Sequence, residues 1–255
     1  MKKIKYWSLL VISLAILGVI YCNPALAYRP FGVEDAGVAG AGVSQLETSW
    51  DYLKWGDGKL ENILLFVPIH GVTDNLELSA EIPYLFHKLS DGAIHRGIGD
   101  INLVAKYLLI NESKKYPAFT FKGAYKLDSG DFANGLGSGD KDYSIFAVIS
   151  KTIGNFSLHS QLGYSWLGKN KNPNLRDIPL YGIAVDWCVN KSLGIELELN
   201  GNRHPDSTET DDPKAWLLGV IYKLSDKIIL DCASRWGLSK SSPIWSTTTG
   251  VSITF

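Results

Sequence analysis

The chain has no long apolar run after residue 27, and this absence excludes a helical inner-membrane protein, because a helical span needs roughly 20 apolar residues. An excess of basic residues is also missing, since 26 acidic side chains stand against 25 basic ones, which excludes the charge pattern of a nucleic-acid-binding protein. Only three cysteines and five histidines occur, and no pair of histidines has metal-ligand spacing supported by cysteines or carboxylates. We therefore predict no metal, no cofactor and no nucleic-acid partner.

The N-terminal residues carry the features of a secretory signal peptide. Three lysines within the first five residues precede an apolar stretch over residues 6–21, and a small-x-small pattern ends at Ala27. The apolar stretch is short for an anchor helix, and the bulky Tyr21 before Cys22 fits a lipoprotein site poorly. We predict a signal peptide over residues 1–27 that is cleaved near Ala27.

From about residue 42 onward, apolar and polar residues alternate in segments of roughly ten residues, which is typical of strands that cross an outer membrane. Every odd position in residues 193–199 is apolar, and residues 76–82 alternate in the same way. A period of two places the two sets on opposite faces of a sheet. The pattern predicts strands near residues 42–53, 60–70, 76–86, 98–110, 117–127, 141–153, 155–166, 178–190, 193–203, 213–224, 227–237 and 244–255.

The connections between these strands alternate between short and longer ones. Residues 154 and 225–226 are short connections, whereas residues 128–140, 167–177 and 204–212 are longer and rich in Gly, Asp, Asn and Ser. Tight periplasmic turns and longer outer loops produce this alternation in an outer-membrane barrel, whereas a soluble sandwich has no reason to keep it. We predict an all-β fold, a transmembrane antiparallel up-and-down β-barrel of about twelve strands over residues 42–255, after an N-terminal periplasmic segment over residues 28–41.

The two faces of the predicted strands differ in chemistry. One face is apolar and aromatic, as in Phe156, Leu158 and Leu162, and this suits lipid because a lysine at mid-membrane depth costs roughly 2–4 kcal/mol. A soluble lipocalin-like barrel would have the opposite arrangement, but the strand count, the loop asymmetry and the aromatic content favour the membrane. The polar face supplies the candidate lumen residues Glu77, Glu81, Asp100, Lys106, Lys122, Lys126, His159, Asp186, Glu196, Glu198, Asp231 and Arg235.

The last predicted strand ends the chain on an aromatic residue. Val251, Ile253 and Phe255 share its outward face. A strand of this kind that ends on Phe resembles the terminal signal read by the outer-membrane assembly machinery, so we predict that Phe255 is an assembly signal. We accordingly expect the protein in the outer membrane of a Gram-negative cell, with membrane lipid, lipopolysaccharide and the assembly machinery as partners.

No catalytic residue is predicted. His159 is an inward-facing histidine in mid-strand, and a membrane-embedded hydrolase would use such a residue with a serine within hydrogen-bond reach, but the sequence marks no such serine. Residues 135–140 are rich in glycine but lack the lysine and the following helix of a phosphate-binding loop. Cys188 and Cys232 fall on opposite faces of non-adjacent strands, so we do not expect them to pair.

Short motifs are spread over nearly the whole chain after the signal peptide, at residues 29–31, 34–37, 45–47, 71–78, 82–84, 97–100, 106–107, 136–139 and 249–255. Together they resemble one family, the outer-membrane transporter barrels grouped as the MetA pathway of phenol degradation. The resemblance implies a barrel for the uptake or export of aromatic or other hydrophobic compounds. It brings no set of binding residues.

Three functions are consistent with these features. The first is a porin-like channel or transporter for small compounds, hydrophobic or aromatic ones included. The second is a non-conducting barrel that has a structural role or binds a partner through its loops, and the third is a membrane-embedded hydrolase. The solute is not identified by the sequence.

Overall fold

The computed structural model describes residues 32–89 and 92–255, so the predicted signal peptide and its cleavage near Ala27 lie outside the described residues. The described chain is almost entirely β-structure, with one short 3-10 helix, η1 (Phe132–Asn134). The strands are β1 (Ser44–Lys54), β2 (Leu60–Gly71), β3 (Leu76–Lys88), β4 (Ile94–Ile98), β5 (Asn102–Ile110), β6 (Ala118–Lys126), β7 (Asp142–Ile153), β8 (Phe156–Trp166), β9 (Ile178–Cys188), β10 (Leu193–Asn202), β11 (Lys214–Lys223), β12 (Ile228–Gly237) and β13 (Trp245–Thr254).

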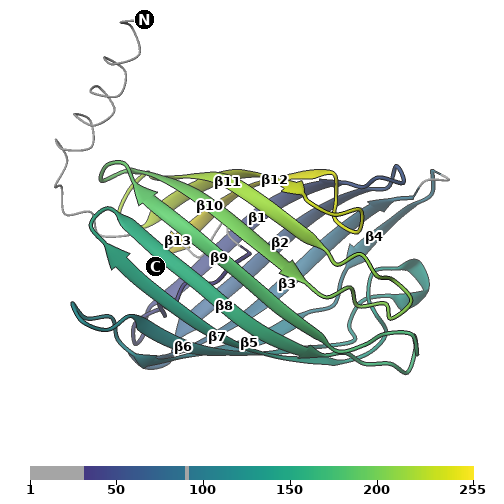
Figure 1. The fold of residues 1–255 in the computed structure, drawn as a ribbon, viewed down its shortest axis with the longest axis horizontal. Helices are drawn as coiled ribbons and strands as arrows, with labels where there is room; N and C mark the ends of the chain where they lie inside the picture. Colours follow the sequence, from purple (N-terminus) through teal and green to yellow (C-terminus); the bar gives the residue numbers. More distant parts are fainter. Residues whose placement is uncertain (1–31, 90–91) are drawn as a thin grey trace, which may run out of the picture.

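The strands form one closed antiparallel barrel (Figure 1). Strand β1 pairs with both β2 and β13, so the last strand closes the barrel against the first. Strands β4 and β5 both pair with β3 and are successive parts of one strand, which is interrupted at residues 99–101. The barrel therefore has twelve strand positions, as the sequence predicted.

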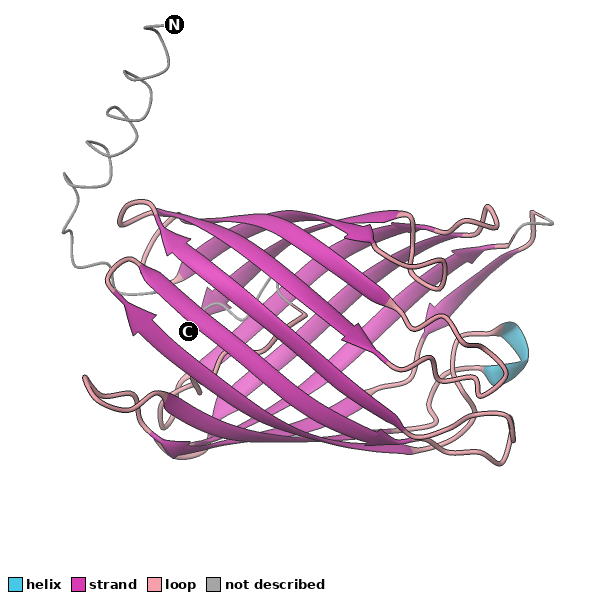
Figure 2. Cartoon of the chain, in the orientation of Figure 1, coloured by secondary structure: helices cyan, strands magenta, loops and turns pink. Residues whose placement is uncertain are grey.

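The two ends of the barrel differ (Figures 1 and 2). Short turns and the C-terminus lie at one end, whereas η1 and the long connections lie at the other. We assign the short-turn end to the periplasm and the opposite end to the cell exterior, as in other outer-membrane barrels. The alternation of connection lengths is less strict than predicted, because residues 55–59 at the outer end form a shorter connection than residues 111–117 at the periplasmic end.

The barrel is apolar outside and polar inside. Outward-facing Leu162 is 71% exposed, whereas inward-facing Glu196 is 1% exposed. So much exposed apolar surface is stable only in contact with lipid. Cys232 is an exposed free thiol, so it does not pair with Cys188, as expected. Within the described ranges, no helix has the length and hydropathy to cross a bilayer.

Candidate transport lumen

Residues 32–43, the lumen segment, run inside the barrel. Near β1 the segment is held at the periplasmic end, where Gly42 N donates to the carbonyl of Gly71 at 2.8 Å. The N-terminal end of the lumen segment lies against β10, where the N–H groups of Gly32 and Val33 donate to Glu198 at 2.5 and 2.8 Å. The structure therefore differs from the expected periplasmic segment over residues 28–41, because its described part lies within the barrel. Polar wall residues supply the partners that a buried backbone requires.

A carboxylate of the lumen segment lies between two lysines of the wall. Glu34 lies 2.5 Å from Lys122 on β6 and 3.4 Å from Lys106 on β5. Lys106 also lies 4.0 Å from Asp35, and Lys122 lies 3.6 Å from Glu81. Buried charges are stable only when they are paired, so this cluster fastens the segment to the wall.

Hydrogen bonds and apolar contacts hold the middle of the lumen segment. Ala36 N donates to Ser150 Oγ at 2.8 Å, and Thr120 Oγ1 donates to the carbonyl of Ala36 at 2.5 Å. Ala39 N donates to Glu77 at 2.6 Å. Ala36 is fully buried among apolar side chains of β5, β6 and β7. The segment is thus fixed by polar and apolar contacts along most of its described length.

Two wall glycines make room for the lumen segment. A Cβ atom at Gly182 would lie 2.4 Å from Cγ2 of Val33, and one at Gly71 would lie 2.0 Å from the carbonyl oxygen of Gly40. Both distances are far below van der Waals contact, so any side chain at either position would push the segment away. The sequence of the wall is therefore adapted to an occupied lumen.

His159 joins two strands in a chain of hydrogen bonds. Its Nδ1 lies 2.7 Å from Ser150 Oγ, and its Nε2 lies 3.1 Å from Asp186. Because an ionised carboxylate only accepts, we assign the proton to Nε2, which leaves Nδ1 of a neutral ring to accept from Ser150. The chain therefore runs from Ala36 N–H through Ser150 and His159 to Asp186.

Strands β10 and β12, which flank β11, carry mainly acidic charged side chains. Glu196 and Asp231 are 1% and 4% exposed, and Arg235 lies 3.2 Å from Glu198. Acidic side chains outnumber basic ones on these two strands. In the described part of the chain, no three His, Cys, Asp or Glu side chains are placed to hold a metal ion.

A cavity of about 240 Å³ lies beside Gly32 and Glu34 of the lumen segment. Strands β1 and β3 contribute carboxylates to its lining, and β5 and β6 contribute lysines. Strand β2 contributes three apolar side chains, Leu65, Val67 and Ile69, which we call the β2 stripe. Sequence reasoning missed this stripe because residues 63–69 are apolar at every position, and such a run does not show which side chains face inward. The sequence did offer one signal for the stripe, because residues 63–69 form an unbroken apolar run whereas most other strands alternate between apolar and polar residues.

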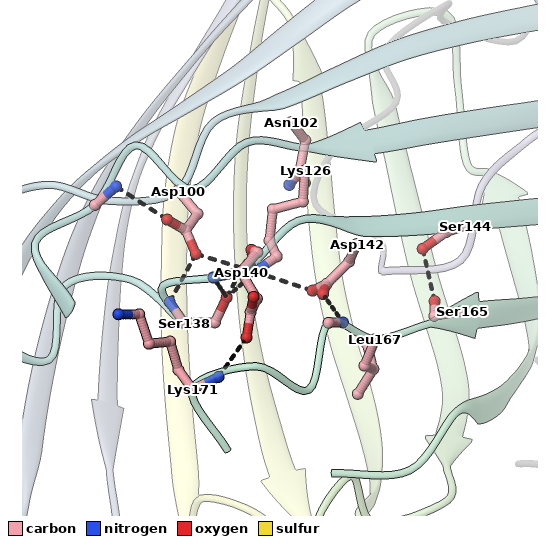
Figure 3. Close-up of polar contacts among 12 residues, drawn as sticks. Asp100, Asn102, Lys126, Ser138, Asp140, Asp142, Ser144, Ser165, Leu167 and Lys171 are labelled. Atoms are coloured by element: carbon pink, nitrogen blue, oxygen red, sulfur yellow. Dashed lines mark hydrogen bonds and ion pairs between the residues drawn. The ribbon is translucent and has the colours of Figure 1, made fainter. Parts of the chain in front are cut away.

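The outer mouth is braced by a loop (Figure 3). Asp100, in the interruption between β4 and β5, accepts hydrogen bonds from the N–H groups of Gly130 and Ser138 at 2.9 and 2.8 Å. Lys126 lies 3.0 Å from Asp100 and 2.9 Å from Asp142. The structure thus places Asp100 and Lys126 at the attachment of the loop over residues 127–141, toward the outer end of the lumen.

Comparison with protein families matches residues 33–255 to the family described as "Putative MetA-pathway of phenol degradation". The chain belongs to this family. The resemblance seen in the short motifs is thereby confirmed. A search of curated protein sequences gives no match.

Solved outer-membrane barrels share the fold. The COG4313 outer membrane channel from Pseudomonas putida F1 is 13% identical, with 87% of this chain and 98% of that chain covered and a TM-score of 0.70. The KdgM porin, solved with disordered oligogalacturonate, is 12% identical, with 82% and 99% covered and a TM-score of 0.56. The β domain of the Bordetella autotransporter BrkA is 10% identical, with 84% and 100% covered and a TM-score of 0.53. The protein is an outer-membrane β-barrel.

Proposed function

We propose that this protein is a channel for small compounds that combine an apolar part with a polar one, aromatic compounds included. The β2 stripe carries the proposal, because it places three apolar side chains of one strand in a cavity that carboxylates and lysines also line. Ala39 and Val43 of the lumen segment pack against the stripe. A solute with a ring can contact the part of the stripe that lines the cavity, while its polar group stays near the carboxylates and lysines. The family's link to phenol degradation supports this solute class, and the likeness to the P. putida outer membrane channel supports a channel function.

The size of the cavity limits the solute. A volume of about 240 Å³ is below the roughly 300–1,000 Å³ of sites that take drug-sized ligands. The lumen segment occupies the space beside the cavity, so it restricts passage further. We expect slow flux of small solutes rather than the large conductance of an open porin.

Flux into proteoliposomes tests the channel function. Phenylalanine and glutamine are suitable because both are zwitterions that cross bare bilayers slowly, and only phenylalanine carries a ring. Arabinose adds an uncharged polar solute. We expect phenylalanine to enter faster than glutamine or arabinose. A heat-modifiable barrel with no solute flux and no channel events in planar bilayers would instead support a non-conducting barrel.

A second candidate function, hydrolysis within the membrane, is favoured by the Ser150–His159–Asp186 chain. The order of donors and acceptors resembles that of a catalytic triad. Ser150 Oγ, however, is buried and accepts the N–H of Ala36, which indicates that the chain fastens the lumen segment. Labelling by a serine-reactive probe that is lost on Ser150→Ala and on His159→Ala would support hydrolysis.

We also propose that the C-terminal residue, Phe255, is the signal recognised by the outer-membrane assembly machinery. Phe255 is 71% exposed at the periplasmic end, and its N–H donates to the carbonyl of Ser44 at 3.0 Å. This exposure supports its proposed recognition by the assembly machinery. Membrane lipid and lipopolysaccharide are the surroundings proposed for the apolar outer face.

A further inference from the structure

A second, smaller cavity lies at the periplasmic end of the barrel, beside the turn between β9 and β10. Its volume is about 60 Å³, and the side chains of Asp186 and Glu196 line it together with apolar residues that include Leu193 and Ile221. Asp186 and Glu196 lie directly opposite each other in the β9–β10 ladder. Like charges directly opposite in a sheet destabilise it, so this arrangement needs compensation.

The two carboxylates have unused acceptors. In the described part of the chain, neither oxygen of Glu196 has a hydrogen-bond partner, and the same holds for Oδ1 of Asp186. Glu196 is 99% buried by the fold, since only 1% of its surface is exposed. Asp231 and Glu198 add negative charge nearby. A buried charge without a partner is strongly unfavourable.

The neighbouring basic groups are engaged elsewhere. Lys223 also lines the cavity, but its Nζ lies 2.8 Å from Asp226 in the next turn. Lys191 is exposed to solvent in the β9–β10 turn. His159 reaches Asp186 only through Oδ2, and Arg235 pairs with Glu198. In the described part of the chain, none of these basic groups donates a hydrogen bond to Oδ1 of Asp186 or to either oxygen of Glu196.

We propose that Asp186 and Glu196 bind a small monovalent cation, either an alkali ion or a short-chain ammonium ion. A cavity of about 60 Å³ has room for roughly two water-sized groups, so it suits a small cation. Because no three acidic, His or Cys side chains of the described residues converge here, the pair is a poor site for a divalent metal. The site is separate from the larger cavity, so this inference goes beyond the proposed channel function.

Thermal unfolding of the detergent-purified protein tests the site. Unfolding is followed by heat modifiability in KCl, NH₄Cl, methylammonium chloride and N-methyl-D-glucamine chloride at equal ionic strength and pH. A ligand that binds only the folded state raises Tm in a saturable way. We expect Tm to be higher by several degrees in at least one of the three small cations than in N-methyl-D-glucamine, whose cation is too large to enter.

Two variants locate the effect. Glu196→Gln keeps the size of the side chain and should abolish the dependence of Tm on the cation. Glu61→Gln removes a buried carboxylate that lies in β2 and pairs with Lys59, so it should keep the dependence. If Glu196→Gln does not fold, Asp186→Asn serves in its place, and the titration of the unmodified protein still decides.

Three results would overturn the proposal. One is an equal Tm in all four salts. If Tm in that case rises only as the pH falls, a proton shared by Asp186 and Glu196 takes the place of the cation. Another is loss of the dependence in Glu61→Gln as well, which would indicate general screening. The third is a stronger response to Ca²⁺ than to any monovalent cation.

Discussion

Removing the charge of Glu34 should release the lumen segment. Glu34→Gln takes away the negative partner of Lys122 at 2.5 Å and of Lys106 at 3.4 Å. Breaking a buried ion pair by removing one partner costs roughly 3–5 kcal/mol. The Glu34 side chain is 24% exposed, and Asp35 and Glu81 stay near the two lysines, so the lower figure of about 3 kcal/mol applies. Because 1.4 kcal/mol corresponds to a factor of ten, the ratio of released to docked segment should rise about 100-fold.

Single-channel recording in planar bilayers measures this release. The segment is tethered to β1 at the periplasmic end, so a released segment can leave the lumen and widen the path. We expect Glu34→Gln to give larger or more frequent openings than the unmodified protein. Glu61→Gln is the matched control. It also removes an inward-facing carboxylate, but Glu61 pairs with Lys59 and not with the lumen segment.

A double-variant cycle checks the cause. Lys122→Met should cost less in the Glu34→Gln background than alone, because the pair is already broken. Identical channel amplitude and open probability in Glu34→Gln, Glu61→Gln and the unmodified protein would refute the assignment of the ion-pair cluster as the fastening of the lumen segment.

Three further predictions concern the wall, the lipid face and the outer loops. Gly182→Ala should displace the lumen segment and increase conductance, since its Cβ would lie 2.4 Å from Val33, whereas Gly123→Ala, with no atom within 4 Å, should behave like the unmodified protein in the same recordings. Leu162→Lys, in the middle of β8, should lower the free energy of unfolding by roughly 2–4 kcal/mol, against about 0–1 kcal/mol for Phe156→Lys at the strand end, in denaturant titrations of the protein in lipid vesicles. Asp140 accepts hydrogen bonds from the backbone N–H of Lys171 and from the side chain of Asn170, and these outweigh the effect of burial and hold the pKa of Asp140 below its ordinary value. The ionised carboxylate of Asp140 therefore attaches residues 167–171 above about pH 4, and the attachment is lost as the pH falls through the lowered pKa. The protection of the Lys171 amide against hydrogen exchange, measured relative to its intrinsic exchange rate at each pH, should therefore fall in acid in the unmodified protein and be low at all pH values in Asp140→Ala. Unchanged protection in that variant would contradict the assignment.

The barrel could be predicted from the sequence because the lipid and the lumen impose opposite demands on alternate residues. Residues 193–203 were predicted as a strand, and β10 covers Leu193–Asn202. The interruption at residues 99–101 was not predicted, because Asp100 continues the polar inward pattern while its carboxylate is used by the loop over residues 127–141. Alternation reports which face a residue occupies but not what the residue touches.

The contacts of the lumen segment could not be predicted from the periodicity of the sequence. The lumen segment has no repeat of its own, and its partners come from strands far apart in the sequence, so no local pattern indicates that it enters the barrel. Ser150 and His159 are a partial exception. The two-residue turn at Gly154 and Asn155 fixes the β7–β8 register, which places Ser150 opposite His159. Ser150 could therefore have been predicted from this register as the serine next to His159.

The β2 stripe provides the most direct test of the channel for solutes with an apolar part. Val67→Thr places a hydroxyl on the stripe with little change in shape, and Thr248→Val, in the same cavity, makes the reverse exchange on β13. The measurement is the ratio of phenylalanine to glutamine flux into proteoliposomes. We expect Val67→Thr to lower the ratio and Thr248→Val to maintain or raise it. A ratio that is the same in both variants and in the unmodified protein, or that is near one throughout, would contradict the role of the stripe in solute passage.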